Sequence, residues 1–345
     1  MAGRLMAMRG QGALIFADLK DGSGNIQALF KKDNFSEEDF NSVTGFFDIG
    51  DIIEVRGILF ITKRGEKTLE VKSFKILTKS LRPIPSEFYG LSDVEERYRK
   101  RYLDTLLNED VKEKFVKRSK IITALREFYD KNGYLEVETP ILQTLAGGTT
   151  AKPFETHLNA LDLDLYLRIA PELYLKRLLV GGVEKVYEIG RCFRNEGMDA
   201  THNPDFTMLE SYVTYQDYND LMKMVEGLME FLVEKIYPGQ NLEMDYKGNK
   251  VSFKAPYKRV RFTDLLNEYL GIDYDKMSES ELLEFAKSRG LKLDPKMHKG
   301  KIADELYKEF IRNNIIQPTF MINLPIELSP LAKKISDDQS KVERF

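Results

Sequence analysis

The 345-residue sequence has little cysteine, no long apolar run and no marked excess of charge of either sign. Its single cysteine, Cys192, excludes a disulfide framework within the chain and a metal site built from several cysteines. No apolar run approaches the roughly 18 residues that a membrane span needs. Lys and Arg number 52 against 55 Asp and Glu, so the net charge by itself indicates no nucleic-acid partner. These features predict a cytoplasmic protein on which any basic surface is local.

The residues that are abundant predict a folded, globular chain. Hydrophobic residues make up 42% of the sequence and charged residues 31%, which provides enough apolar material for sizeable cores. At about 150 residues per domain, the length predicts two domains. A strand-like pattern starts at Met1 itself, so we expect the natural protein to begin further upstream.

Residues 1–78 show the period of two that is typical of β-strands. The turn-rich segment Asp21-Gly22-Ser23-Gly24-Asn25 is predicted to connect two strands as a hairpin. The expected elements are strands at 14–17, 26–30, 51–62 and 68–77, with a helix near 36–47. About five strands with one helix fit a small, partly open barrel of the OB type, although other small β-barrels have the same strand count.

A linker is predicted at residues 79–108, because Leu81-Arg82-Pro83-Ile84-Pro85 contains two prolines that force an extended backbone. Residues 109–345 form the second predicted domain, where strand-like segments alternate with amphipathic helices. Its expected strands are 166–169, 185–193, 206–215 and 318–324, its expected helices are 111–132, 172–179 and 218–236, and a mainly helical insertion falls at about 271–316. The first helix is predicted to bury an apolar face of Phe115, Ile121, Ile122, Leu125 and Phe128. This order predicts an α+β domain with an antiparallel sheet.

Two regions of the second domain carry a distinctive pattern. Gly133 is expected to end a helix, and the extended run Tyr134-Leu135-Glu136-Val137-Glu138-Thr139-Pro140 follows it; taken alone, this is an ordinary helix-to-strand connection. Phe193-Arg194-Asn195-Glu196 ends one expected strand, and His202-Asn203-Pro204-Asp205-Phe206 leads into the next after a short loop. In this order the segments resemble motifs 1 and 2 of the class II aminoacyl-tRNA synthetases.

Three further strings narrow the resemblance. They are Gly147-Gly148-Thr149-Thr150-Ala151-Lys152-Pro153-Phe154, Ala170-Pro171-Glu172-Leu173-Tyr174-Leu175-Lys176-Arg177-Leu178 and Ser329-Pro330-Leu331-Ala332-Lys333. Together they resemble the bacterial-type lysyl-tRNA synthetases over nearly the whole chain. The resemblance implies an N-terminal OB-fold β-barrel that binds the anticodon, followed by a class II catalytic domain. It also implies a homodimeric ligase that activates L-lysine with ATP and Mg²⁺ and transfers it to tRNA(Lys).

The resemblance assigns an ATP site around motif 2. Arg194 matches the catalytic arginine that bridges the substrate carboxylate and the α-phosphate of ATP, a task that suits its planar, bidentate guanidinium. Glu196, His202 and Asn203 match positions that hold ATP. Phe206 matches the position whose ring stacks on adenine.

A lysine substrate carries two ammonium groups, which need anionic partners wherever water is excluded. By the resemblance, Glu172 binds the α-ammonium, while Glu210 and the Tyr212 hydroxyl bind the side-chain ammonium. Gly148 allows close approach of the backbone, and Arg194 completes the lysine site. An enzyme for aspartate would need a cation where Glu210 stands, so the predicted substrate is lysine.

In the barrel, Phe16, Gln27 and Glu66 match positions at which related synthetases contact the anticodon. An aromatic ring can stack on an unpaired base, and amide and carboxylate groups can hydrogen-bond its Watson–Crick edge. Glu70 lies on the same segment as Glu66 and is the competing candidate for the carboxylate.

The resemblance stops before motif 3, the glycine-rich segment whose arginine binds the γ-phosphate in this family. No metal ligand is expected within the chain, because the family's magnesium-binding carboxylates would follow Phe345. We therefore expect the chain as given to be poorly active in lysine-dependent ATP–pyrophosphate exchange. The alternative function is that of a non-catalytic paralogue that binds lysine, nucleotide or RNA. A third hypothesis, an RNA-binding barrel with an unrelated second domain, leaves the motif 2 segments unexplained.

Overall fold

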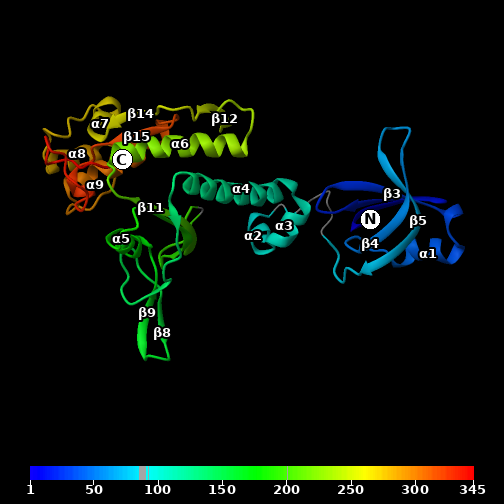
Figure 1. The fold of residues 1–345 in the computed structure, drawn as a ribbon. Coiled ribbons are helices and arrows are strands. Elements are labelled where there is room, and N and C mark those ends of the chain that lie inside the picture. The colour runs from blue at the N-terminus through cyan, green and yellow to red at the C-terminus, as the bar shows by residue number, and fades with distance from the viewer. Residues whose placement is uncertain (85–90, 92, 200) are drawn as a thin grey trace. The chain divides into compact units, whose positions relative to one another are not determined.

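The computed structural model describes residues 1–84, 91, 93–199 and 201–345 (Figure 1). The chain forms two compact units, Met1–Phe115 and Val116–Phe345. Pro85, the last residue of the proline-rich segment, lies outside the described residues. None of the described helices is long and apolar enough to cross a membrane.

Five strands of the first unit form a closed barrel in the order β1-β2-β3-β5-β4. Its elements are β1 (Ala2–Gln11), β2 (Leu14–Lys20), β3 (Asn25–Lys31), the 3-10 turn η1 (Lys32–Asn34), α1 (Glu37–Phe46), β4 (Ile52–Ile61) and β5 (Lys67–Thr78). The expected hairpin is present, because β2 and β3 pair antiparallel across the turn at Asp21–Asn25. The expectation of a partly open barrel is wrong: β3 pairs in parallel with β5, and β4 pairs with both β5 and β1, which closes the ring.

The barrel closes around an apolar core that follows the strand alternation. On β2, Ile15, Ala17 and Leu19 are buried, while the residues between them are partly exposed. Ser36 is the N-cap of helix α1: its hydroxyl accepts a hydrogen bond from the backbone N–H of Asp39 at 3.1 Å, which stabilises the start of the helix. The helix contributes Phe40 and Val43 to this core. The half-buried residues of β2 and β3 are therefore available on the outer face of the barrel.

The predicted linker contains two helices, α2 (Val94–Arg99) and α3 (Arg101–Leu107), which precede α4 (Glu109–Lys131). Asp104 is fully buried and accepts hydrogen bonds from Arg97 Nε at 2.8 Å, from Arg101 and from Asn108 Nδ2 at 2.6 Å. Burial alone raises the pKa of Asp104, but the hydrogen bonds from Asn108 and Arg97 hold it below its usual value. Asp104 therefore stays ionised and joins α2 to α3.

The centre of the second unit is the antiparallel pair β10 (Lys185–Phe193) and β11 (Asp205–Val213). The prediction of an antiparallel sheet is correct for this pair, but the short strand β6 (Leu135–Glu136) joins β10 in parallel. Helix α4 and helix α6 (Tyr218–Ile236), the two long helices of Figure 1, pack through Leu125, Phe128 and Leu228. Ile122 packs against the same cluster. The predicted apolar face of α4 is wrong for Phe115 and Ile121, which are exposed.

Smaller elements surround this pair. They are β7 (Leu142–Gln143), β8 (Glu155–Leu158), β9 (Leu163–Leu167), α5 (Glu172–Val180), β12 (Glu243–Tyr246), β13 (Asn249–Ser252), β14 (Lys258–Arg261), α7 (Phe262–Leu270), α8 (Glu279–Ser288), α9 (Lys299–Phe310), η2 (Arg312–Asn314), β15 (Thr319–Ile322) and η3 (Ile326–Leu328). Strands β7, β9 and β8 form a small antiparallel sheet, whereas β14 and β15 pair in parallel. The strand expected at 166–169 lies earlier, because β9 ends at Leu167. Helices α7, α8 and α9 share a core of their own.

Candidate functional site

One face of the β10–β11 pair carries most of the residues predicted to bind substrate. In the ladder, Cys192 stands opposite Phe206, Gly190 opposite Met208, and Glu188 opposite Glu210. Residues directly opposite in an antiparallel pair project from the same face. Phe206 and Glu210 therefore lie on one face, four residues or about 13 Å apart along β11.

Arg194 follows the end of β10 and lies against Phe206. Its backbone N–H donates to the carbonyl of Pro204 at 2.8 Å, which holds the two strand ends together. The guanidinium carbon is 5.0 Å from the centre of the Phe206 ring. Arg194 Nε is buried and, among the described residues, has no hydrogen-bond partner. A buried donor costs free energy unless it is paired, so this group suits an anionic ligand.

The loop between the strands holds the remaining residues predicted to bind ATP, all of them exposed. Glu196 accepts a hydrogen bond from the backbone N–H of Lys152 at 3.3 Å. His202 Nδ1 is 2.8 Å from the carboxylate of Asp199 in the same loop. The described residues include no hydrogen-bond partner for the side chain of Asn203. The structure thus brings Phe206 to Arg194, whereas His202 is turned to Asp199.

Glu210 and Tyr212 lie on the same face of β11 as Phe206, nearer the end of the strand. The Tyr212 hydroxyl donates to Glu210 Oε1 at 2.5 Å. Burial raises the pKa of the Glu210 carboxyl; the hydrogen bond from Tyr212 opposes this shift, and the charge of Glu172 adds to it. Burial and the same carboxylate raise the pKa of Tyr212, so the phenol stays protonated and donates. The result is a partly buried carboxylate with a neutral partner.

Glu172 and Gly148 adjoin this carboxylate. Glu172 opens α5, and its Oε1 is 2.5 Å from Lys176 Nζ, which in turn lies 5.8 Å from the centre of the Tyr212 ring. Gly148 has a φ of +94°, and a β-carbon there would come within 3.0 Å of the Glu172 side chain. A side chain at position 148 would therefore crowd Glu172, and the predicted approach of a substrate to Gly148 stays a prediction.

Sequence reasoning missed a buried polar network beside Glu210. Arg168 and Glu188 side chains are only 2% and 4% exposed, and Arg168 Nη1 is 2.5 Å from Glu188 Oε1. The Thr139 hydroxyl donates to Glu188 Oε2 at 2.6 Å. Both charged residues stand between apolar neighbours in the sequence, and this is the signal that could have revealed them, because charges inside an apolar strand are buried only when paired.

In the first unit, all three predicted anticodon-binding residues line one groove of about 780 Å³. Phe16 lies on β2, Gln27 on β3 and Glu66 in the β4–β5 turn, and the groove is also lined by Arg9, Gly10, Thr62, Lys63 and Arg64. The side-chain oxygen Oε1 of Gln27 accepts a hydrogen bond from the Thr68 hydroxyl at 3.0 Å, which leaves the side-chain NH2 group free to donate.

The competing carboxylate, Glu70, already forms ion pairs with lysines of the barrel. Its oxygens are 2.6 Å from Lys31 Nζ and 2.7 Å from Lys72 Nζ. Hydrogen bonds from Lys31, Lys72 and Asn34 lower the pKa of Glu70 to about 2. Glu66 has no such partner within the part of the chain that the structure describes. The geometry therefore favours Glu66 over Glu70 as the carboxylate open to a ligand.

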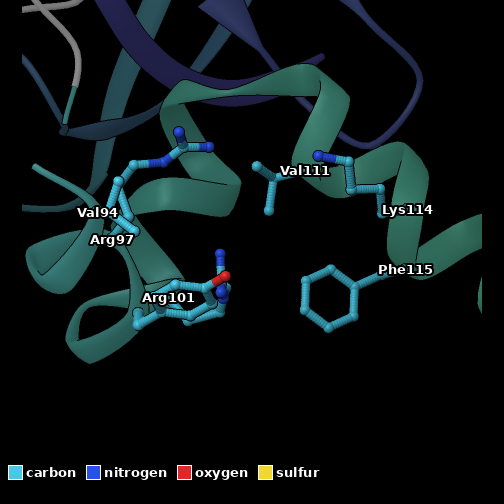
Figure 2. A pocket seen from close by; sticks show the side chains of 7 residues that line it. Val94, Arg97, Arg101, Val111, Lys114 and Phe115 are labelled. Carbon is cyan, nitrogen blue, oxygen red and sulfur yellow. The ribbon is translucent and has the colours of Figure 1, made fainter. Parts of the chain in front are cut away.

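A second cavity of the first unit, about 350 Å³, lies among α2, α3 and the start of α4. Figure 2 shows Arg97, Arg101, Lys114 and Phe115 around it. Because Asp104 already pairs with both arginines, the cavity carries less positive charge than its three cations suggest. None of the predicted site residues lines it.

Two family models match the chain. The model of the class II tRNA synthetases (D, K and N) covers residues 93–345, and that of the OB-fold nucleic acid binding domain covers residues 1–77. With the closed barrel and the β10–β11 site, these matches define the class of protein: a class II tRNA synthetase whose catalytic domain follows an OB-fold domain.

The similar proteins narrow this class. A lysine–tRNA ligase of Thermoanaerobacter sp. (strain X514) is 46% identical over the whole chain, which spans 69% of that protein. A lysine–tRNA ligase of Clostridium novyi (strain NT) is 47% identical, with 68% of it spanned, and one of Staphylococcus epidermidis is 45% identical, with 69% spanned. The chain belongs to the lysine–tRNA ligase family.

Proposed function

We propose that the chain is a lysine–tRNA ligase of low activity as given. The reaction is activation of L-lysine by ATP to lysyl-adenylate, then transfer of the lysyl group to tRNA(Lys). The observation that carries this proposal is the β10–β11 pair: at one end lies the buried Arg194 Nε, which has no hydrogen-bond partner among the described residues, and at the other a partly buried carboxylate. Lysine has the complementary groups at its two ends, a carboxylate and an ammonium.

In the first step, a carboxylate oxygen of lysine attacks the α-phosphorus of ATP, and the bond to the departing pyrophosphate breaks. Arg194 is proposed to hold both anions and to stabilise the charge that develops between them. Its unpaired Nε and its position against Phe206 support this role. Phe206 would stack on adenine, and Glu196, His202 and Asn203 would bind ATP from the loop. In the second step, a terminal hydroxyl of the tRNA attacks the lysyl carbonyl carbon, and AMP leaves.

The lysine pocket is proposed to consist of Gly148, Glu172, Glu210 and Tyr212, with Arg194 at the carboxylate end. Glu172 Oε1 already binds Lys176, so its second oxygen, on the side of Gly148, is left for the α-ammonium. Glu210 would take the side-chain ammonium, with Tyr212 fixing the orientation of its carboxylate.

Magnesium belongs to this proposal as the companion of ATP. Across residues 1–84, 91, 93–199 and 201–345, no group of three or more His, Cys, Asp or Glu side chains could hold a metal ion. The described residues therefore do not fit a resident magnesium site.

We also propose a cytoplasmic homodimer. Apolar side chains on α4 and in the segments that follow it are exposed in the second unit, among them Val116, Ile121, Leu135 and Leu142. Exposed apolar side chains mark an interaction site where they form a patch. Sedimentation of the chain as a two-copy particle would agree with the dimer, whereas a single copy at micromolar concentration would contradict it.

Calorimetric titration with lysine tests the proposed substrate. The matched ligand is norleucine, which keeps the carbon chain and the α-groups of lysine but lacks the side-chain ammonium. We expect lysine to bind and norleucine to bind at least tenfold more weakly, because a carboxylate that loses its charged partner stays buried and unpaired. Equal affinity for the two ligands would contradict the proposed pocket.

For the barrel, we propose that Phe16, Gln27 and Glu66 contact the anticodon in their shared groove. Replacing Phe16 with alanine should weaken binding of tRNA(Lys) roughly tenfold, because base stacking on an aromatic ring is worth about 1–3 kcal/mol. Phe46→Ala is the matched control, since Phe46 is exposed on α1 and does not line the groove. Equal dissociation constants for Phe16→Ala and Phe46→Ala would argue against this role of the groove.

A further inference from the structure

A buried ion pair lies on the same face of the sheet as the proposed lysine pocket. Arg168 Nε donates to the carbonyl of Arg191 at 2.8 Å, and Nη1 donates to Glu188 and to the Thr139 hydroxyl at 3.0 Å. A β-carbon on Gly190 would come within 2.1 Å of Arg168 Nη2. The guanidinium therefore covers β10 on the side from which Glu188 projects, and only glycine at position 190 leaves space for it.

Glu188 is also the cross-strand neighbour of Glu210, so their β-carbons are about 5 Å apart. Three carboxylates lie near one another here: Glu210, Glu188 on β10 and Glu172 on α5. The other titratable groups around Glu210 are Tyr212 on its own strand, Cys192 on β10, Lys176 on α5 and Arg168, which directly follows β9 in the sequence. Of the three carboxylates, Glu172 pairs with Lys176 and Glu188 with Arg168. Among the residues that the structure describes, Glu210 has no ion pair.

We infer that Arg168 is a specificity-determining residue: it neutralises Glu188, so that of the three carboxylates that the structure describes here, Glu210 is the one left without an ion pair to select the side-chain ammonium of the substrate. Thr139, which bonds both partners, is a positioning residue in this arrangement. The inference rests on the proposed function, because it deepens the assignment of Glu210 to lysine.

The two members of the ion pair, Arg168 and Glu188, have opposite effects on the ionisation of Glu210. Without the Arg168 cation, the bare charge of Glu188 opposes ionisation of Glu210, so lysine binding should fail at a higher pH than in the native chain. Without the Glu188 anion, the bare charge of Arg168 favours ionisation of Glu210 and repels the incoming ammonium. Because Glu188 and Glu210 are cross-strand neighbours, we expect the unpaired charge of Glu188 in Arg168→Met to shift the midpoint by about one pH unit.

The experiment is calorimetric titration of lysine across pH 4 to about 9, with the native chain, Arg168→Met, Glu188→Gln and the double variant. We expect the pH midpoint of lysine affinity to rise in Arg168→Met, to fall in Glu188→Gln, and to return to the native value in the double variant. Glu188→Gln should also bind lysine roughly tenfold more weakly at neutral pH. Glu184→Gln, which removes an exposed carboxylate just before β10, is the matched control and should keep the native midpoint.

Identical midpoints in the folded single variants would overturn the inference. Because a single variant leaves a buried charge unpaired and can unfold, folding is checked first by circular dichroism. If neither single variant folds, the double variant decides: a native midpoint supports the inference, and a displaced midpoint overturns it. Failure of the proposed function is distinguishable, because the native chain would then not bind lysine in preference to norleucine at any pH.

Discussion

Replacing Glu210 with glutamine is expected to weaken lysine binding roughly a hundredfold. The partly buried carboxylate is the proposed partner of the side-chain ammonium, and loss of one member of a desolvated charge pair costs about 3 kcal/mol. Glutamine keeps the shape of the side chain and an oxygen that can accept the Tyr212 hydrogen bond. The loss should therefore report the charge, with nucleotide affinity unchanged.

The same variant should unfold at a higher temperature when no lysine is present. The folded chain raises the pKa of Glu210 above its unfolded value, so the ionised carboxylate destabilises the fold at neutral pH. This destabilisation is present above the raised pKa and disappears as the pH falls below the unfolded value. Glutamine cannot ionise, so it removes the cost at neutral pH, at the expense of function.

Calorimetry measures the first effect and thermal unfolding at pH 7 the second. Glu184→Gln is the matched control, because Glu184 is exposed just before β10 and should change neither quantity. An unchanged lysine affinity in Glu210→Gln would remove Glu210 from the pocket. A lower unfolding temperature would show that the carboxylate is a structural group of the fold.

Alanine at Gly190 is expected to destabilise the second unit by about 3 kcal/mol, the usual cost of breaking a buried ion pair. The added methyl group would meet Arg168 Nη2 at 2.1 Å. Arg168 cannot swing into solvent without losing its bonds to Glu188, Thr139 and Arg191. The prediction is therefore displacement of the guanidinium and a much lower midpoint of chemical unfolding.

Urea unfolding measures the midpoints of Gly190→Ala and Gly197→Ala, which are compared with that of the native chain. Gly197 is an exposed loop glycine whose β-carbon would meet nothing within 4 Å, so its alanine variant should unfold like the native chain. If both variants keep the native midpoint, the guanidinium has room that the structure does not show.

The fold was predictable where the local chemistry is distinctive. The glycine-rich turn at 21–25 and the alternation on either side of it identify β2 and β3. The Gly133 turn, with its φ of +75°, identifies the end of α4. Closure of the barrel was not predictable, because it depends on parallel pairing of β3 with β5, whose residues are about 40 positions apart. Alternation within a strand carries no information about its partner.

The site was predictable only in part, for electrostatic reasons. The resemblance names Glu210 and Arg194, and the structure places both on one face of β10–β11, but the roles of these residues stay predictions. Arg168 and Glu188 were missed, since an isolated charge in a sequence is most often a surface residue. The contact of His202 with Asp199 was not predicted either, because Asp199 is not among the residues that the resemblance names.

The pairing of β10 with β11 has a consequence for how the site distinguishes lysine from shorter diamino acids. On the proposed assignment, Arg194, which follows β10, and Glu210, on β11, bind opposite ends of lysine. The rise of about 3.4 Å per residue along these strands is fixed by covalent geometry. The ladder then sets the positions of the two backbones, and the Tyr212 hydrogen bond restrains the Glu210 carboxylate. A diamino acid with one methylene fewer falls about 1 Å short of one end, a misplacement that costs on the order of a hundredfold in rate. Discrimination by length would thus be a property of the backbone, and substitutions that leave the ladder intact should preserve it.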